Sequence, residues 1–282
     1  MKPKMCLRLA ALMALAVAAA PGARASDTAG KTSCPIVAST DFAIYGQVSE
    51  GGVAASSRRW MTHFFDWWKA QDPAVDFVFL SATEAQACTN LVSTYPNLRM
   101  WVQPGGNAYD QQVALGATGK ANINDFIDKG GAYLGVCAGA YYAAPDYWWE
   151  GEHYAHPHLL GAYPRTMEGA ISRIAPWPGY AMTALDNGRN AIYYGGPTIG
   201  LQHTRLANLA GERTASFASI DGQLPAVIIY GNLLLTSVHL EAFEGDESAG
   251  LGTADRIENY KYLATLINRV ARTNFEVPEA TP

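Results

Sequence analysis

The chain has 282 residues, of which 49% are hydrophobic and 16% charged, and its formal net charge is −5. This composition is too apolar for a disordered chain, and the length suits one large domain or two small ones. The acidic balance gives no dominant basic surface, so we expect no nucleic-acid partner. Four cysteines are too few for a scaffold built from disulfides.

The first 25 residues have the three parts of a signal peptide. Three basic residues among the first eight precede an apolar run over 9–20, and Ala23-Arg24-Ala25 supplies an A-x-A cleavage site. The run is about a dozen residues long, shorter than the roughly 20 that span a bilayer, so a retained anchor is the less favoured alternative. We expect cleavage after Ala25, export to the periplasm or the outside of the cell, and one mature domain over 26–282.

Three cysteines remain in the expected mature chain: Cys34, Cys88 and Cys137. An oxidising compartment favours pairing, and an odd number leaves one thiol free. Cys34 and Cys88 stand in polar segments, where a surface bridge is feasible, so they are the candidates for a disulfide. Three free thiols are the alternative.

Short apolar strands alternate with amphipathic helices along the chain. Strands are expected at 42–45, 75–80, 98–102, 133–136, 191–194, 226–230 and 233–238, and helices at 58–68, around 123–127 and from about 254. Continuous apolar strands separated by helices are typical of a parallel sheet that is covered on both faces. The sequence therefore predicts an α/β, doubly wound fold with a mostly parallel sheet.

The strongest chemical signal is Gly135-Val136-Cys137-Ala138-Gly139, which follows a strand and opens a helix. A turn of this form holds its central residue in a strained conformation with the side chain exposed, and glycines are needed where neighbouring chains approach. The N-terminus of the following helix favours the thiolate form of Cys137. A buried structural cysteine is the alternative interpretation.

A cysteine nucleophile needs a base, and the base needs an orienting group. His239 ends a predicted strand, and active residues gather at the carboxyl ends of parallel strands. Glu241 is close enough along the loop to accept the imidazole N–H. Gly105, Gly106 and the amide of Ala138 are candidate donors to an oxyanion, with an ordinary Pro-Gly turn as the alternative for the glycines.

Together these motifs resemble the class I glutamine amidotransferase-like fold. The run from Gly130 to Tyr141 and the stretch Tyr193-Tyr194-Gly195-Gly196-Pro197 are more similar to the N-terminal domain of fungal biotin–protein ligases and its free-standing bacterial relatives. The resemblance covers most of 41–270. It implies a flavodoxin-like sheet and a triad of Cys137, His239 and Glu241.

Two departures from glutaminase domains affect the expected activity. Tyr141 stands where those domains usually have the glutamine that holds the substrate, and Leu240 replaces the proline of their His-Pro-Glu. No synthetase domain is present to receive ammonia, so glutamine-dependent amidotransfer is not expected. Biotin ligase activity is not expected either, because in the family that chemistry belongs to another domain.

Two further clusters have both functional and purely structural interpretations. Six aromatic residues between 141 and 154 either line a pocket that includes Tyr141 or form ordinary packing. His153, His156 and His158 are weak candidates for a zinc or copper site, since their spacing matches no strong metal signature. We therefore expect no metal and no cofactor.

The sequence leads to three hypotheses of function. The first is an exported cysteine hydrolase, not a biotin ligase, that attacks an amide or ester of a small molecule or peptide. The second is a non-catalytic module that binds such a ligand, and the third is a thiol-based redox or stress protein. The sequence identifies neither the substrate nor the oligomeric state.

Overall fold

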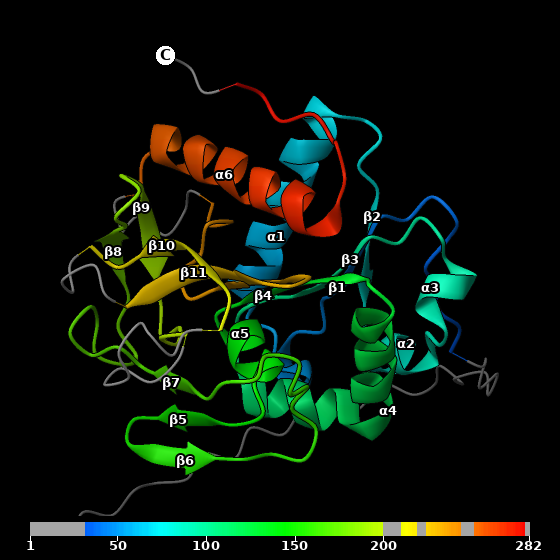
Figure 1. Ribbon diagram of the computed structural model, residues 1–282, viewed down its shortest axis with the longest axis horizontal. Helices are drawn as coiled ribbons and strands as arrows, with labels where there is room; N and C mark the ends of the chain where they lie inside the picture. The colour runs from blue at the N-terminus through cyan, green and yellow to red at the C-terminus, as the bar shows by residue number, and fades with distance from the viewer. Residues whose placement is uncertain (1–31, 200–209, 219–223, 244–250, 280–282) are drawn as a thin grey trace, which may run out of the picture. The chain divides into compact units, whose positions relative to one another are not determined.

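A seven-stranded sheet forms the centre of the computed structural model, which describes residues 32–199, 210–218, 224–243 and 251–279 (Figure 1). Its strand order is β10-β11-β12-β4-β3-β1-β2. The five strands from β12 to β2 are parallel, and β11 and β10 are added as antiparallel strands. The strand bounds are β1 Phe42–Tyr45, β2 Phe77–Leu80, β3 Met100–Gln103, β4 Ala132–Val136, β10 Glu212–Ser216, β11 Pro225–Tyr230 and β12 Leu233–Thr236.

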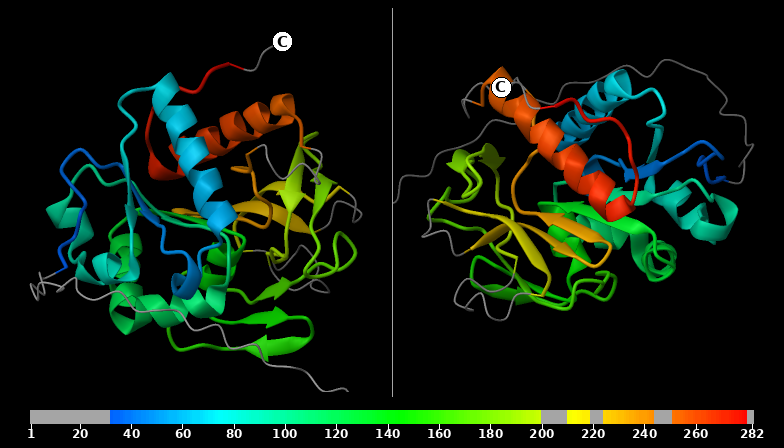
Figure 2. Two further views of the ribbon diagram at one scale, coloured as in Figure 1. Left: turned by 180° about the vertical axis from the view of Figure 1, so that it is seen from behind. Right: turned by 45° about the horizontal axis from the view of Figure 1, so that its top comes forward.

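Helices cover both faces of this sheet (Figures 1 and 2). On one face, α1 (Ala55–Gln71) and α6 (Thr253–Ala271) bury the side chains of one hydrophobic cluster. The other face carries α2 (Ala82–Ala87), α3 (Leu91–Thr94), α4 (Ala108–Asp128) and α5 (Ala138–Ala143). A sheet with apolar side chains on both faces requires two such layers, because either face left bare would expose them to water. The predicted doubly wound, mostly parallel α/β fold is confirmed.

The helices follow the periodicity of the sequence. In α1, Trp60, Phe64 and Trp68 recur at intervals of four residues and are buried. In α6, Tyr260, Leu263, Ile267 and Val270 form the buried stripe. Both helices therefore lie where their apolar faces predict, although α1 begins three residues earlier than expected.

Two small sheets lie outside the central one. Strands β5 (Tyr147–Trp149), β6 (Glu152–Tyr154) and β7 (Met167–Gly169) form a three-stranded sheet, and β8 (Ala181–Ala184) pairs antiparallel with β9 (Asn190–Tyr193). The strand expected at 191–194 is thus present as β9, but it belongs to a separate hairpin. Its alternating pattern could not show which sheet it joins.

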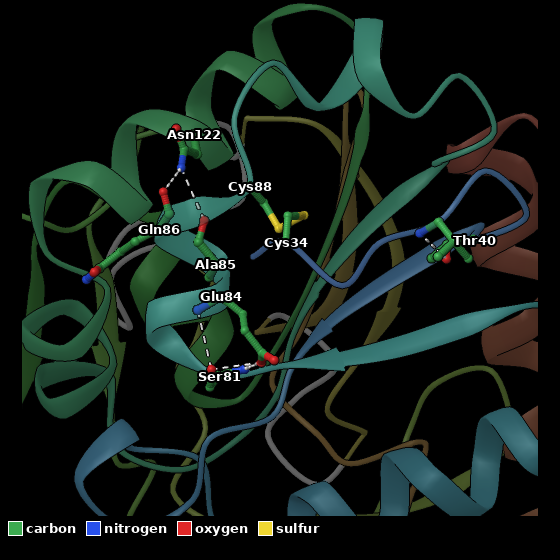
Figure 3. Close-up of a disulfide and its surroundings, with 9 residues drawn as sticks. Cys34, Thr40, Ser81, Glu84, Ala85, Gln86, Cys88 and Asn122 are labelled. Carbon is green, nitrogen blue, oxygen red and sulfur yellow. Dashed lines mark hydrogen bonds between the residues drawn. A yellow bond between two sulfur atoms is a disulfide. The ribbon is translucent and has the colours of Figure 1, made fainter. Parts of the chain in front are cut away.

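A disulfide joins Cys34 to Cys88 (Figure 3). Cys88 is buried at the C-terminal end of α2, a helix that begins with a reciprocal capping box between Ser81 and Glu84. Cys34 lies in the segment before β1. The bridge therefore fixes that segment against α2, and Cys137 is the free cysteine of the described residues.

Some predictions concern parts of the chain outside the described residues. The predicted signal peptide, residues 1–25, is one of them, so its cleavage and the expected export remain predictions. The single domain expected over 26–282 also remains a prediction. No helix in the described ranges has both the length and the apolar character that a membrane span requires.

Candidate functional site

Cys137 occupies a strained turn between β4 and α5. Its backbone angles are φ 52° and ψ −106°, a conformation that non-glycine residues rarely adopt and that is typical of a nucleophile elbow. A β-carbon on Gly135 would lie 2.5 Å from the carbonyl oxygen of Gly139, and one on Gly139 would lie 2.0 Å from that of Gln103. Both glycines are therefore required by close backbone contacts.

His239 lies beside Cys137 and is held from its other side by Glu241. Both the imidazole and Cβ of Cys137 pack against Gly105, and the Nδ1 atom of the imidazole is 2.7 Å from Oε1 of Glu241. The His239 backbone N–H donates to the carbonyl of Ile192 in β9, and the Trp60 ring packs edge-on against the imidazole. The β8–β9 hairpin and α1 thus help to fix the ring.

The electrostatics favour an imidazolium in this position. Burial of His239 lowers its pKa, but the Glu241 carboxylate and the Cys137 side chain together outweigh burial and raise the pKa to about 10. Glu241 is completely buried, so its charge is little screened by water. An imidazolium here stabilises a thiolate on Cys137, which is the nucleophilic form of cysteine.

The glycine loop after β3 packs directly against this pair. A β-carbon on Gly105 would lie 2.6 Å from Cε1 of His239 and 3.3 Å from Cβ of Cys137. Gly106 has φ +145° and lies so near Gly52 that a β-carbon would clash with its carbonyl oxygen. Ala138 is the first residue of α5, so its amide has no carbonyl partner within the helix. The structure therefore brings together all three residues predicted to form an oxyanion site.

A cavity of about 530 Å³ opens above the sulfur, a size typical of small-molecule sites. Cys137, Ala138 and Gly106 lie on its wall, which is otherwise rich in aromatic rings. The Sγ atom of Cys137 is 3.4 Å from the carbonyl oxygen of Tyr194, another residue of the wall. A ligand in this cavity would place its reacting atom next to the thiol.

Some residues of the predicted aromatic cluster line the cavity, and others do not. Tyr141, Tyr147, Trp149 and Tyr154 line the cavity, whereas Tyr142 is core and Trp148 is exposed. The hydroxyl of Tyr141 donates to the carbonyl of Gly195. Burial is the main cause that raises the pKa of Tyr141 well above the usual value of a phenol. The phenol therefore stays neutral and serves as part of the cavity wall.

The histidines of the loop lie in different surroundings. His153 is on the exposed hairpin and pairs with Asp146, whereas His156 lies among the rings of Tyr109, Tyr147 and Tyr154. Within the described ranges, no group of three histidine, cysteine or carboxylate side chains is placed to hold a metal ion. His153 lies within β6, whereas His156 follows its end.

Several residues of the pocket were not predicted. Tyr109 comes from the first turn of α4, and Trp177 and Gly195 come from segments on either side of the β8–β9 hairpin. Tyr194 and Gly195 were part of a stretch that resembled the biotin–protein ligase family, but no role was given to them. Exposure of a large ring, as for Trp177, is a structural signal that the sequence does not contain.

The fold is similar to that of solved structures of one class. A solved structure described as a glutamine amidotransferase superposes on 82% of this chain and 99% of its own length with a TM-score of 0.54 at 14% identity. A second, a glutamine amidotransferase from Thermotoga maritima, covers 83% of this chain and 86% of its own length at 11% identity with a TM-score of 0.39. The chain has a class I glutamine amidotransferase-like fold.

Within this fold class, the amino-acid sequence is similar to one particular family. Residues 94–171, which include the elbow and most of the aromatic wall, match the family model described as biotin-protein ligase, N terminal. The chain is also 28% identical over 196 residues to a biotin–protein ligase of Schizosaccharomyces pombe. That match covers 59% of this chain and only 29% of the ligase. The resemblance predicted from the motifs is confirmed.

These matches correct the functional prediction. An exported cysteine hydrolase that is not a biotin ligase was expected, and this was wrong, because the family model and the curated relative are both biotin–protein ligases. The physical reason is that an elbow with a paired histidine defines a reactive thiol but not the molecule that finally receives the acyl group.

Proposed function

We propose that this chain is an acyl-transfer domain of the biotin–protein ligase N-terminal kind. Cys137 accepts an acyl group as a thioester, and an acceptor nucleophile, an amine of a second molecule, then takes that group. The observation that carries the proposal is the elbow thiol, which is paired with His239 and Glu241 at the wall of an aromatic cavity.

The residues have separate tasks in this transfer. The Cys137 thiolate attacks the carbonyl carbon of an activated acyl donor, and His239 gives its proton to the leaving group. The Glu241 carboxylate holds the imidazole and offsets its positive charge. The amides of Gly105, Gly106 and Ala138 are positioned to donate hydrogen bonds to the oxygen that becomes negative.

The burial of the site supports transfer to an amine. Cys137 is 5% exposed, His239 2% and Glu241 0%, so the thioester would form where little water reaches it. The S. pombe relative is named for joining biotin to protein. Biotinyl is therefore the first acyl group to test, beside acetyl as the smallest.

The test uses the 4-nitrophenyl esters of acetate and biotin as donors and follows the mass of the intact protein. We expect one added acyl group on the wild type, none on Cys137→Ala, and a rate of formation reduced roughly 100-fold in His239→Gln. His153→Gln is the matched control, because His153 is an exposed histidine outside the cavity lining. Addition of an amine should discharge the adduct.

Two results would overturn the proposal. One is an acyl group that appears equally fast in the wild type and in His239→Gln. The other is an adduct that disappears in buffer as quickly as in the presence of the amine, because that behaviour is hydrolysis and not transfer.

A further inference from the structure

Aromatic rings in mutual contact form most of the cavity wall. Tyr109 meets His156 at a ring distance of 4.9 Å. Trp149 meets Trp177 at 5.1 Å, and Trp177 stacks on Tyr194 at 5.3 Å with an interplanar angle of 22°. The Tyr194 ring covers one face of Trp177, so a ligand would contact the part of Trp177 that stays exposed.

Two of these rings keep large uncovered surfaces at the edge of the cavity. Tyr109 is 49% exposed and Trp177 42% exposed, although both residues line the cavity. Tyr109 lies on α4 and Trp177 on the loop before β8, so the rings come from distant parts of the chain. Covering such rings with a flat apolar group would remove their surface from water and add stacking contacts.

Apart from Cys137 beside His239, the cavity wall also contains no ionised side chain. All of its lining residues belong to the described part of the chain, and none of them is aspartate, glutamate, lysine or arginine. Burial lowers the pKa of His156 below its usual value, so this imidazole is neutral at pH 7. An ionised ligand group would lose its water here without gaining a partner of opposite charge.

One buried polar atom of a wall residue has no partner. The Nε2 atom of His156 is buried and has no hydrogen-bond partner among the described residues. A neutral imidazole nitrogen can exchange a hydrogen bond with a carbonyl or an N–H group without any charge.

From these observations we infer that the cavity selects an uncharged compound that carries a flat ring system, which it holds between Tyr109 and Trp177 with the acyl carbon toward Cys137. The inference rests on the proposed function for the role of that acyl carbon. It excludes free glutamine, whose ammonium and carboxylate groups would find no partners in the wall.

The test compares the binding of 2-naphthamide, 2-naphthoate and glutamine to the Cys137→Ala protein by isothermal titration calorimetry at pH 8. The first two probes share one ring system and differ in charge. We expect 2-naphthamide to bind at least tenfold more tightly than 2-naphthoate, with no binding of glutamine. Tyr109→Ala and Trp177→Ala should each weaken the binding of 2-naphthamide roughly two- to tenfold.

Trp148→Ala is the matched control. Trp148 is an exposed tryptophan next to Trp149, and it does not line the cavity. The inference is overturned if 2-naphthamide does not bind, if 2-naphthoate binds as tightly, or if Trp148→Ala weakens binding as much as Trp177→Ala does. Binding to Cys137→Ala requires no thiol chemistry, and acetylation of the wild type requires no flat ring. The binding experiment and the acetylation experiment therefore show separately which of the two proposals fails.

Discussion

Gly105 leaves room for the imidazole of His239, since a β-carbon on this glycine would lie 2.6 Å from Cε1 of the ring. We predict that Gly105→Ala displaces His239 from Cys137 and slows acylation of the thiol roughly 100-fold, the effect of a misplacement of about 1 Å. Stopped-flow release of 4-nitrophenol measures this rate.

Gly252→Ala is the matched control for that substitution. Among the residues that the structure describes, nothing lies within 4 Å of a β-carbon added to Gly252, and its φ of −74° suits alanine. A Gly105→Ala protein that is acylated as fast as the control would contradict the close packing of Gly105 against His239.

A buried chain of hydrogen bonds joins β3 and α4 to the start of the glycine loop. Gln103 receives a bond from Trp101 and donates to Oε1 of Gln111, which in turn donates to the carbonyl of Pro104. We predict that Gln111→Leu lowers the free energy of unfolding by about 1 to 3 kcal/mol, because it leaves buried polar groups of Gln103 and Pro104 without partners. Urea unfolding measures the change.

The neighbouring Gln112 provides the comparison. It is also buried, and its Oε1 atom has no hydrogen-bond partner among the described residues. Gln112→Leu should therefore change stability by less than about 1 kcal/mol. Equal losses in the two variants would mean that this chain of hydrogen bonds contributes nothing specific.

The disulfide between Cys34 and Cys88 closes a loop with a sequence separation of 54 residues. Its removal by Cys34→Ser with Cys88→Ala should cost about 2 to 4 kcal/mol of unfolding free energy. The wild type should lose a similar amount when a reductant is added, and the double variant should not respond to the reductant. A wild type that is equally stable with and without reductant would contradict this prediction.

The stability of the protein should depend on pH through His239. Its pKa is raised from 6.5 to about 10 in the folded protein, so the folded state holds more protons than the unfolded state between these values. The stabilisation is fully present below about pH 6.5 and is lost as the pH rises through about 10. Because the Cys137 thiolate lacks the proton that the unfolded thiol keeps up to about pH 8.5, the stability difference between the wild type and His239→Gln should shrink mainly between about pH 8.5 and 10, by at most about 1.4 kcal/mol per pH unit.

Urea midpoints at pH 6.5, 8 and 9.5 test this dependence. His153→Gln serves as the control, since His153 is an exposed histidine. A difference between wild type and His239→Gln that stays constant from pH 6.5 to 9.5 would contradict the raised pKa of His239.

The central sheet and the elbow were predictable because their signals are local. Gly135 and Gly139 surround Cys137 in the sequence, and the close contacts of both glycines lie on the same strand-to-helix turn or the adjacent strand. The pairing of Cys137 with His239 was also accessible, since both residues follow parallel strands that are neighbours in the sheet. The rule that active residues lie at the carboxyl ends of parallel strands therefore related two residues that are about a hundred positions apart in the sequence.

The aromatic wall was not predictable in the same way. Tyr147 and Trp149 belong to a three-residue strand in a small separate sheet, and such short strands have too few residues to show a period. Trp177 reaches the cavity from a loop, and the course of a loop depends on tertiary contacts. The composition of the segment indicated many rings, but not which of them would face Cys137.

The pairing of the Cys137 thiolate with the His239 imidazolium is the central claim, and the alkylation rate of Cys137 tests it most directly. Iodoacetamide labelling at pH 7, followed by peptide mapping, gives this rate without any assumption about the acyl group. We predict that Cys137 of the wild type reacts at least tenfold faster than in His239→Gln or in the urea-unfolded protein. Equal rates in all three would show that the imidazole does not activate the sulfur.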